Sequence, residues 1–114
     1  MKSHPLGNRG PPKYAVKLHE KALDEFEALP DAIQERMEAG IDELQHDPFR
    51  PRPGVDVLKL EDVGGDDDLY RLRVGDYRAI YTVDKEGRVV LVVVVDDREI
   101  GYTRLVAITK ARLG

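Results

Sequence analysis

Apolar residues near the N-terminus follow first a strand period and then a helix period. Residues 14–18 alternate between apolar and other side chains, which predicts a short strand. Two helices are predicted after it, one over residues 19–28 and a second that starts at Asp31, beyond the helix-breaking Pro30. Gln34 stands three residues after Asp31, which is the spacing of a capping box. The apolar stripe of the second helix consists of Ile33, Met37, Ile41 and Leu44.

The second half of the chain carries a strand signal. A stiff, proline-rich connector over residues 46–54 leads into it. Gly75 and Asp76 are typical of a two-residue hairpin turn, and residues 84–87 are typical of a four-residue hairpin loop ending in glycine. A short helix is predicted over residues 104–113. The predicted strands are residues 55–60, 69–74, 77–83 and 88–95.

Together these elements predict one α+β domain. We expect a helix hairpin packed on one face of an antiparallel, twisted sheet of about four strands, with a short helix at the C-terminus. The last strand is rich in valine on both faces, so we expect it to be central. The domain should span residues 14–114. Residues 1–13 contain three prolines and two glycines without any period, and we expect them to be a flexible leader.

Composition removes several classes of protein. The 114 residues include no cysteine, which excludes a disulfide framework, a thiolate zinc site and a cysteine nucleophile. The longest apolar run, residues 89–95, is far shorter than the roughly 20 residues that a membrane-spanning helix needs. His4, His19 and His46 are far apart and lack metal-ligand spacing. We therefore expect a cytoplasmic protein with no metal, no other cofactor and no membrane partner.

The net charge of −4 argues at first against a nucleic-acid partner. The charge is unevenly distributed, however, because residues 20–47 carry ten acidic and two basic side chains. That segment contributes −8, and the rest of the chain carries +4. Since salt screens charges beyond about 8–10 Å, the local balance decides what binds at a cleft. The sequence therefore predicts acidic helices and a basic sheet.

The two-residue turn sets the register of the strands that it joins. In that register Arg73 lies directly opposite Arg78, and Arg71 shares their face of the sheet. Like charges across a strand pair are destabilising, so this arrangement needs an explanation. The arginines could form a cationic face for a phosphate backbone or a groove for an acidic peptide, or nearby acids could neutralise them. The acids in question are Asp96, Asp97 and those of the loop over residues 61–68.

Three stretches resemble the RelE/ParE toxin superfamily. They are Leu-Lys-Leu at 58–60, the segment at 69–81 that contains Tyr-Arg-Leu-Arg-Val-Gly-Asp-Tyr-Arg, and Asp-Arg-Glu-Ile-Gly-Tyr at 97–102. The resemblance implies a toxin of a type II toxin-antitoxin system with a RelE-like fold. It further implies a ribosome-dependent endoribonuclease that cleaves messenger RNA without a metal, by in-line attack of the 2′-hydroxyl, and so inhibits translation. The implied partners are a cognate antitoxin, the ribosome and messenger RNA.

The same resemblance implies roles for individual residues. Arg78 matches an arginine that stabilises the charge developing on the phosphate, and Arg98 matches a second phosphate contact. Tyr102 matches a tyrosine that stacks on or orients the target nucleotide, so these three are the candidate catalytic residues. Arginine charge aimed at a phosphorane can act without a metal ion. The candidate RNA-binding residues are Lys59, Arg71, Arg73, Arg50 and Arg52.

Departures from the superfamily pattern leave other functions open. Asp97 stands where many members carry histidine, and Asp96 adds a second acid beside Arg98. The interval from Arg98 to Tyr102 is shorter than in well-known messenger-cutting members, and this chain is acidic where typical RelE toxins are basic. One alternative is a ParE-like inhibitor of DNA gyrase. The other is a toxin fold with weakened catalysis that acts by binding.

Overall fold

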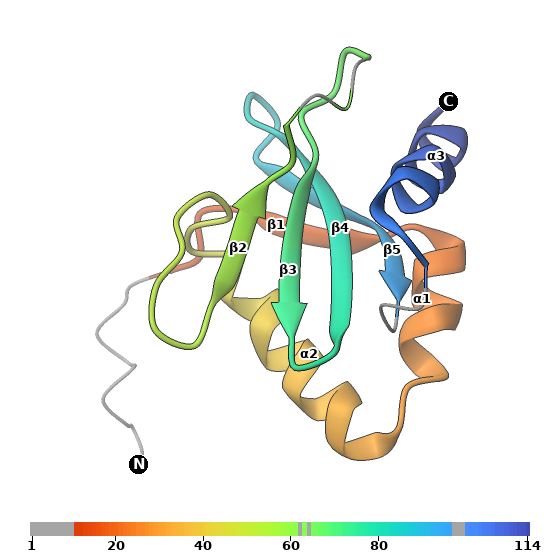
Figure 1. The fold of residues 1–114 in the computed structure, drawn as a ribbon. Coiled ribbons are helices and arrows are strands. Elements are labelled where there is room, and N and C mark those ends of the chain that lie inside the picture. Colours follow the sequence, from red (N-terminus) through yellow and green to blue (C-terminus); the bar gives the residue numbers. More distant parts are fainter. Residues whose placement is uncertain (1–10, 62, 64, 97–99) are drawn as a thin grey trace.

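The computed structural model describes residues 11–61, 63, 65–96 and 100–114. Within these residues the chain forms a five-stranded sheet and three helices (Figure 1), which confirms the predicted α+β class. The strands are β1 (Ala15–Leu18), β2 (Asp56–Lys59), β3 (Tyr70–Val74), β4 (Tyr77–Asp84) and β5 (Val89–Asp96). The helices are α1 (Glu20–Glu27), α2 (Asp31–Glu43) and α3 (Tyr102–Leu113).

The sheet is mixed, with the strand order β1-β5-β4-β3-β2. β1 pairs in parallel with β5, whereas the other neighbours are antiparallel. The prediction of an antiparallel sheet of about four strands is wrong here, because β1 adds a fifth, parallel strand. Apolar alternation predicts that a strand exists but not its partner, and a parallel partner requires a long crossover, here through α1 and α2. β5 lies between β1 and β4, which confirms its predicted central place.

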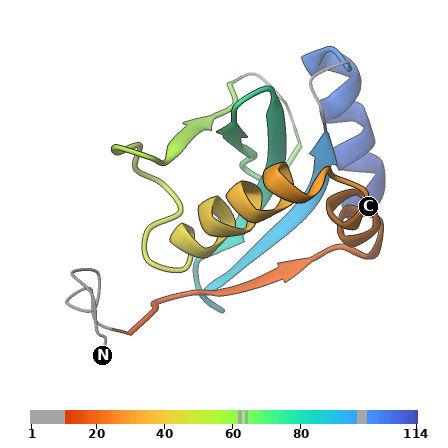
Figure 2. The same cartoon turned by 90° about the horizontal axis from the view of Figure 1, so that it is seen from below.

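One face of the sheet is covered by α2, which runs across it (Figure 2). Three residues of the predicted stripe, Met37, Ile41 and Leu44, are buried there. Gly40 lets the helix come close, because a Cβ at this position would lie only 3.2 Å from Leu72 Cδ2. The core on this face also contains Tyr70, Leu72, Ala79, Tyr81, Val90 and Val92.

The predicted capping box of α2 does not form. Pro30 occupies the N-cap position, and no side chain accepts a hydrogen bond there. Asp31 therefore becomes the first helical residue, where its carboxylate complements the helix dipole but cannot cap the third residue of the helix. In α1, by contrast, the His19 side chain caps the helix, since its Nδ1 accepts from the Lys21 amide at 3.0 Å.

The opposite face of the sheet is partly covered by α3. Leu105 of α3 packs into a second apolar cluster with Leu69, Ile80, Val93 and Val94. A β-bulge between β4 and β5 shifts the register beside Ile80, so that Ile80 pairs with Val94 and its neighbour Tyr81 with Val92. This face is therefore basic only where α3 leaves it open. Within the described residues, no helix is long and apolar enough to cross a membrane.

An ion pair closes the outer edge of β5 where β1 no longer covers it. β1 accompanies β5 only as far as Val92, which leaves the backbone groups beyond it without a strand partner on that side. Glu25 of α1 accepts the Val95 amide at 3.0 Å, and Arg112 of α3 donates to the Val93 carbonyl at 2.8 Å. The two side chains also bind each other through both carboxylate oxygens, at 2.9 and 2.8 Å. The pair therefore joins α1, β5 and α3.

The loop between β4 and β5 is one residue later than predicted. Asp84 pairs with Val89, so the loop consists of residues 85–88. Arg88, rather than the glycine before it, takes the left-handed conformation, with φ of 56°. Gly87 serves a different purpose, because its amide donates to Asp84 Oδ1 and a Cβ there would lie 2.5 Å from the other carboxylate oxygen.

Candidate functional site

Four charged residues form one row across the sheet. Asp56 of β2 pairs with Arg73 of β3, Arg73 pairs with Arg78 of β4, and Arg78 pairs with Asp96 of β5. Residues in register on neighbouring strands point to the same face, so the row reads acid, base, base, acid. The predicted register of the hairpin is confirmed, and each arginine has an acid on its outer side. The sequence predicted Asp96 as an acid that could neutralise these arginines, but it did not predict Asp56 in this position.

Arg78 is the buried centre of this row, with 7% of its surface exposed. Its Nη2 donates to Asp96 Oδ2 and, at 2.6 Å, to the Ile100 carbonyl. Its Nε is buried and has no hydrogen-bond partner among the described residues. The guanidinium thus keeps a fixed position at the end of β5, next to the start of α3.

Tyr102, the first residue of α3, covers Arg78. The guanidinium carbon lies 4.8 Å from the centre of the Tyr102 ring, which is cation–π distance. Tyr102 is 41% exposed, so one side of its ring holds the arginine and the rest faces solvent. The structure thus brings together two of the three candidate catalytic residues. The third, Arg98, lies outside the described residues, as does Asp97.

Arg71 and Arg73 lie on the same strand face as Arg78 but differ in their contacts. Arg71 donates to Asp56 Oδ1 at 2.6 Å, and its Nε is buried without a hydrogen-bond partner among the described residues. Arg73 is exposed, and its Nε donates to the Gly75 carbonyl at 3.0 Å. These two arginines extend the positive charge of the row from Arg78 toward β2.

The other candidate RNA-binding residues lie elsewhere. Arg52 ties the connector to the end of α2, because its guanidinium donates to the Glu43 carbonyl and carboxylate and to the Asp47 and Arg50 carbonyls. The Arg50 side chain is 76% exposed and lies 3.5 Å from an Asp47 carboxylate oxygen. Lys59 has the opposite alternation to Arg71 and Arg73 and forms an ion pair with Asp68 at 3.7 Å. The structure does not bring these three together with Arg78.

The buried tyrosines belong to the core. Tyr81 donates to the Pro48 carbonyl at 2.5 Å and stacks on Tyr70, with 5.4 Å between ring centres. Burial raises the pKa of Tyr81 well above its ordinary value, and burial together with the charge of Asp68 raises the pKa of Tyr70. Both hydroxyls stay protonated at neutral pH. In the described part of the chain, no three acidic or histidine side chains gather in a way that could hold a metal ion.

Comparison with solved structures places this fold in a class of protein. The RelE–RelB complex from Pyrococcus horikoshii contains a chain that is 38% identical, with a TM-score of 0.65, covering 78% of this chain and 99% of that one. The toxin-antitoxin complex RelBE2 from Mycobacterium tuberculosis contains a chain that is 26% identical, with a TM-score of 0.60, covering 76% of this chain and 99% of that one. A double mutant of the Escherichia coli toxin RelE in the free state is 26% identical, with a TM-score of 0.63, and the match covers 86% of this chain and 97% of that one. The class is that of the RelE/ParE toxins.

The family follows from the sequence itself. Residues 16–102 match the model of the ParE toxin of type II toxin-antitoxin systems, parDE. The match covers more than half of the chain and runs from the second residue of β1 to the first residue of α3. This chain therefore belongs to the ParE toxin family, and it is a RelE-like toxin of a type II toxin-antitoxin system. The predicted resemblance is confirmed.

Proposed function

We propose that this toxin is a ribosome-dependent, metal-independent endoribonuclease that cleaves messenger RNA in the cytoplasm and so inhibits translation. The observation that carries the proposal is the contact between buried Arg78 and half-exposed Tyr102. A fixed guanidinium beside an exposed aromatic ring offers a phosphate contact and a base-stacking surface within one nucleotide of each other. The likeness to RelE toxins supports the same function.

In this proposal each residue has a limited task. The Tyr102 ring stacks on the target base and holds the nucleotide so that its 2′-hydroxyl lies in line with the scissile bond. Arg78 stabilises the charge that develops on the phosphate. Arg71 and Arg73 contact the backbone on the side of β2. Arg98 is proposed as a second phosphate contact, and Arg50, Arg52 and Lys59 as peripheral contacts.

The pairing of Arg78 with Asp96 leaves Nη1 as a donor for a substrate. Both protein bonds that the guanidinium donates to described residues come from Nη2, and Nε has no partner among them but is buried. An arginine has five N–H donors in a fixed fork, so it can hold Asp96 on one side and a phosphate oxygen on the other. Asp96 then acts as the residue that orients Arg78.

A second candidate function is inhibition by binding, as in a gyrase-directed or catalytically weakened toxin. The specific observation in its favour is the burial of both Arg78 and Asp96, at 7% and 8% exposed. A neutralised, buried pair contributes less field at a phosphate than an exposed arginine would. The sequence match to a ParE model fits the same alternative.

Substitutions at Tyr102 separate these functions, because its ring is exposed and its removal leaves the buried ion pair in place. Induced expression of the wild-type chain in bacteria is expected to arrest growth and to produce new messenger 5′ ends at ribosomal A sites. Tyr102→Ala should abolish these ends, whereas Tyr102→Phe, which keeps the ring, should retain them. Growth arrest with intact messages and broken DNA would favour gyrase, and no growth effect of the soluble wild type would contradict both.

A further inference from the structure

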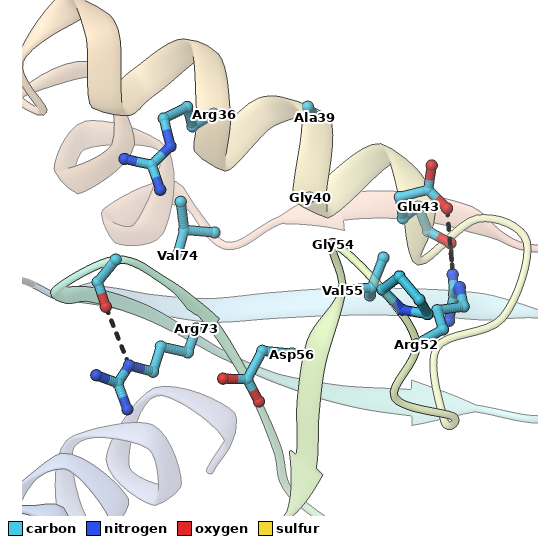
Figure 3. A pocket seen from close by; sticks show the side chains of 12 residues that line it. Arg36, Ala39, Gly40, Glu43, Arg52, Gly54, Val55, Asp56, Arg73 and Val74 are labelled. Carbon is cyan, nitrogen blue, oxygen red and sulfur yellow. Dashed lines mark hydrogen bonds and ion pairs between the residues drawn. The ribbon is translucent and has the colours of Figure 1, made fainter.

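Hollows border both faces of the sheet. On the face of α2, a hollow of about 900 Å³ separates this helix from the ends of β2 and β3 (Figure 3). Val74 points toward this helix, whereas the charged end of Arg73 lies on the other side of the strand (Figure 3). On the face of the arginines, a hollow of about 480 Å³ lies between α3 and the segment that follows β2. We call it the α3 hollow, and it adjoins the candidate site because Tyr102 lines it.

Apolar side chains form the walls of the α3 hollow. Val106 lines it from α3, and Leu60 and Val63 line it from the segment after β2. All three pack, partly buried, against the apolar cluster beneath α3. Lys110 holds the two walls together, since its Nζ donates to the Val63 carbonyl. The volume lies within the range of about 300–1,000 Å³ that is usual for small-molecule sites, so the hollow has room for a nucleobase.

Tyr102 connects the α3 hollow with Arg78. One face of its ring is occupied by the guanidinium, whose central carbon lies 4.8 Å from the ring centre. A base that stacks on this ring therefore has to use the other face. Because Tyr102 is 41% exposed and lines the α3 hollow, a base stacked there would lie against the apolar walls, with its phosphate close to Arg78.

The polar groups of the α3 hollow differ from those of the arginine row. Among the described residues that line it, Glu61 is the acidic one, and Thr103 and Lys110 of α3 supply hydroxyl and ammonium donors. Glu61 forms no ion pair with any described residue. A carboxylate here repels the phosphates of an RNA backbone but accepts hydrogen bonds from the N–H groups of a base. The hollow therefore suits a base, and the arginine row suits its phosphate.

We propose that the α3 hollow binds the base of the nucleotide directly 5′ to the scissile bond and selects guanine, with Glu61 as the specificity-determining residue. The Glu61 carboxylate accepts from N1–H and from the N2 amino group of guanine, while Thr103 or Lys110 donates to O6. This inference rests on the proposed function and deepens it, since the base belongs to the messenger that is cleaved.

The choice of guanine follows from the arrangement of donors on the four bases. Guanine presents two adjacent N–H donors on its Watson–Crick edge, which match the two oxygens of a carboxylate. Adenine and cytosine present one amino group beside a ring-nitrogen acceptor, and uracil presents one N–H between two carbonyls. In each of these three, an acceptor would face the carboxylate of Glu61. A bidentate pair of this kind should favour guanine about tenfold or more.

The first test uses ribosomes programmed with messages whose A-site codon is randomised. The full chain is added, and the cleaved ends are sequenced. Relative to the uncut pool, guanine should stand 5′ to the cut about tenfold more often than uracil. Glu61→Gln, which replaces one acceptor oxygen by a donor, should lower this preference to about threefold or less while cleavage continues. Asp67→Asn, a matched neutralisation in the same loop but outside the α3 hollow, should leave the preference unchanged.

The second test measures binding without ribosomes or cleavage. In amide NMR spectra of the full chain, guanosine 3′-monophosphate should shift the signals of Val63, Thr103 and Val106 at concentrations at which uridine 3′-monophosphate does not. Glu61→Gln should weaken this binding about tenfold, and Asp67→Asn should not. Thermal unfolding shows whether both variants remain folded. A guanine preference in the cleaved messages without these shifts would mean that another group selects the base, and it would overturn the proposal.

The outcomes distinguish this inference from the proposed function. Equal use of the four bases, a guanine preference that persists in Glu61→Gln, or equal effects of the Glu61 and Asp67 variants would overturn the base selection alone, because the messages would still be cleaved. Intact messages with the wild-type chain would overturn both.

Discussion

Arg78 illustrates how a single buried charge is made tolerable. A guanidinium with 7% exposure, placed opposite another arginine, would be strongly destabilising by itself. Asp96 compensates it from the next strand, and the Ile100 carbonyl and the Tyr102 ring supply two further contacts. The neighbouring pair of Arg71 and Asp56 is more open, with 58% of the Asp56 side chain exposed. Asp96 should therefore contribute more to the free energy of unfolding than Asp56 does.

Alanine substitutions at the two acids provide the comparison. Asp96→Ala should lower the free energy of unfolding by about 3 kcal/mol, because it leaves Arg78 as an uncompensated buried charge. Asp56→Ala removes the same charge from a largely exposed position and should cost less than about 1 kcal/mol. Urea unfolding at neutral pH measures both values. Equal losses would contradict the view that burial decides the strength of each pair.

Tyr81 predicts a dependence of stability on alkaline pH. Burial raises the pKa of its hydroxyl in the folded state above the value of about 10 expected when unfolded. The unfolded chain therefore loses this proton first, so the stability contribution is complete below about pH 10 and is lost as the pH rises further. Tyr81→Phe should flatten this fall. At neutral pH it should cost about 1–2 kcal/mol, since the Pro48 carbonyl loses its donor.

The matched control for this experiment is Tyr102→Phe, which removes a hydroxyl from a half-exposed ring. Denaturant unfolding of the wild type and both variants between pH 7 and 11 gives the comparison. If Tyr81→Phe retained the full alkaline loss of the wild type, Tyr81 would not be its source. Tyr70, whose pKa is also raised, should leave a smaller residual dependence in the variant.

At the scale of elements, the ion pair of Glu25 and Arg112 fastens the C-terminal helix. The pair satisfies an amide and a carbonyl at the edge of β5, so its role extends beyond the attraction of two charges. The hydrogen bond from Arg112 to Glu25 raises the pKa of Arg112, which keeps this guanidinium charged. Through α3 the pair also helps to place Tyr102 over Arg78.

A double-mutant cycle with Glu25→Gln and Arg112→Met should reveal this coupling. We expect each single variant to lower the free energy of unfolding by about 1–2 kcal/mol and the coupling energy to be about 1 kcal/mol, since the side chains are partly exposed. Amide exchange of α3 should quicken more than that of α2 in both single variants. A coupling energy near zero would show that the edge of β5 is satisfied without the pair.

Local rules predicted the elements of this fold but not all of their partners. The turn at Gly75 and Asp76 set the register of β3 and β4 correctly because a two-residue loop allows only one pairing. The prediction of a capping box was wrong because Pro30, and not Asp31, occupies the N-cap position. The parallel pairing of β1 could not be predicted, since it joins residues far apart in the sequence.

The candidate site was predictable to a similar extent. Alternation placed Arg71, Arg73 and Arg78 on one face, and the structure confirms that arrangement. The contact of Tyr102 with Arg78 depends on where α3 packs, and the exclusion of Arg52 from the site depends on carbonyls at the end of α2. Asp56 lies within the strand predicted over residues 55–60, but its register with Arg73 could be known only from the fold.

For the whole molecule, the charge is divided between the two acidic helices α1 and α2 and an arginine-bearing sheet face, whereas α3 carries only basic charged side chains. With Arg71, Arg73, Arg78 and Arg98 as the proposed phosphate contacts, about four counterions would be released on binding. The logarithm of affinity for programmed ribosomes should therefore fall with the logarithm of salt concentration with a slope of about −3, much less steep than for a strongly basic RNA-binding protein. Arg73→Gln should reduce the slope by about 0.7, and Lys21→Gln, on α1, should not change it. A slope below −5 would indicate a wider basic contact surface.

The parallel pairing of β1 with β5 has a consequence for the synthesis of the protein. Ala15 has no strand partner until Val89 has been synthesised, and Arg78 has neither its acid nor its aromatic contact until Asp96 and Tyr102 have been synthesised. Contacts of such long sequence separation form late, after the local hairpin and helices. A nascent chain, or one released early by a premature stop before β5, therefore lacks the pairing of β1 with β5 and the contacts of Arg78 with Asp96 and Tyr102. The arginine–tyrosine contact can therefore form only after the ribosome has translated past Tyr102.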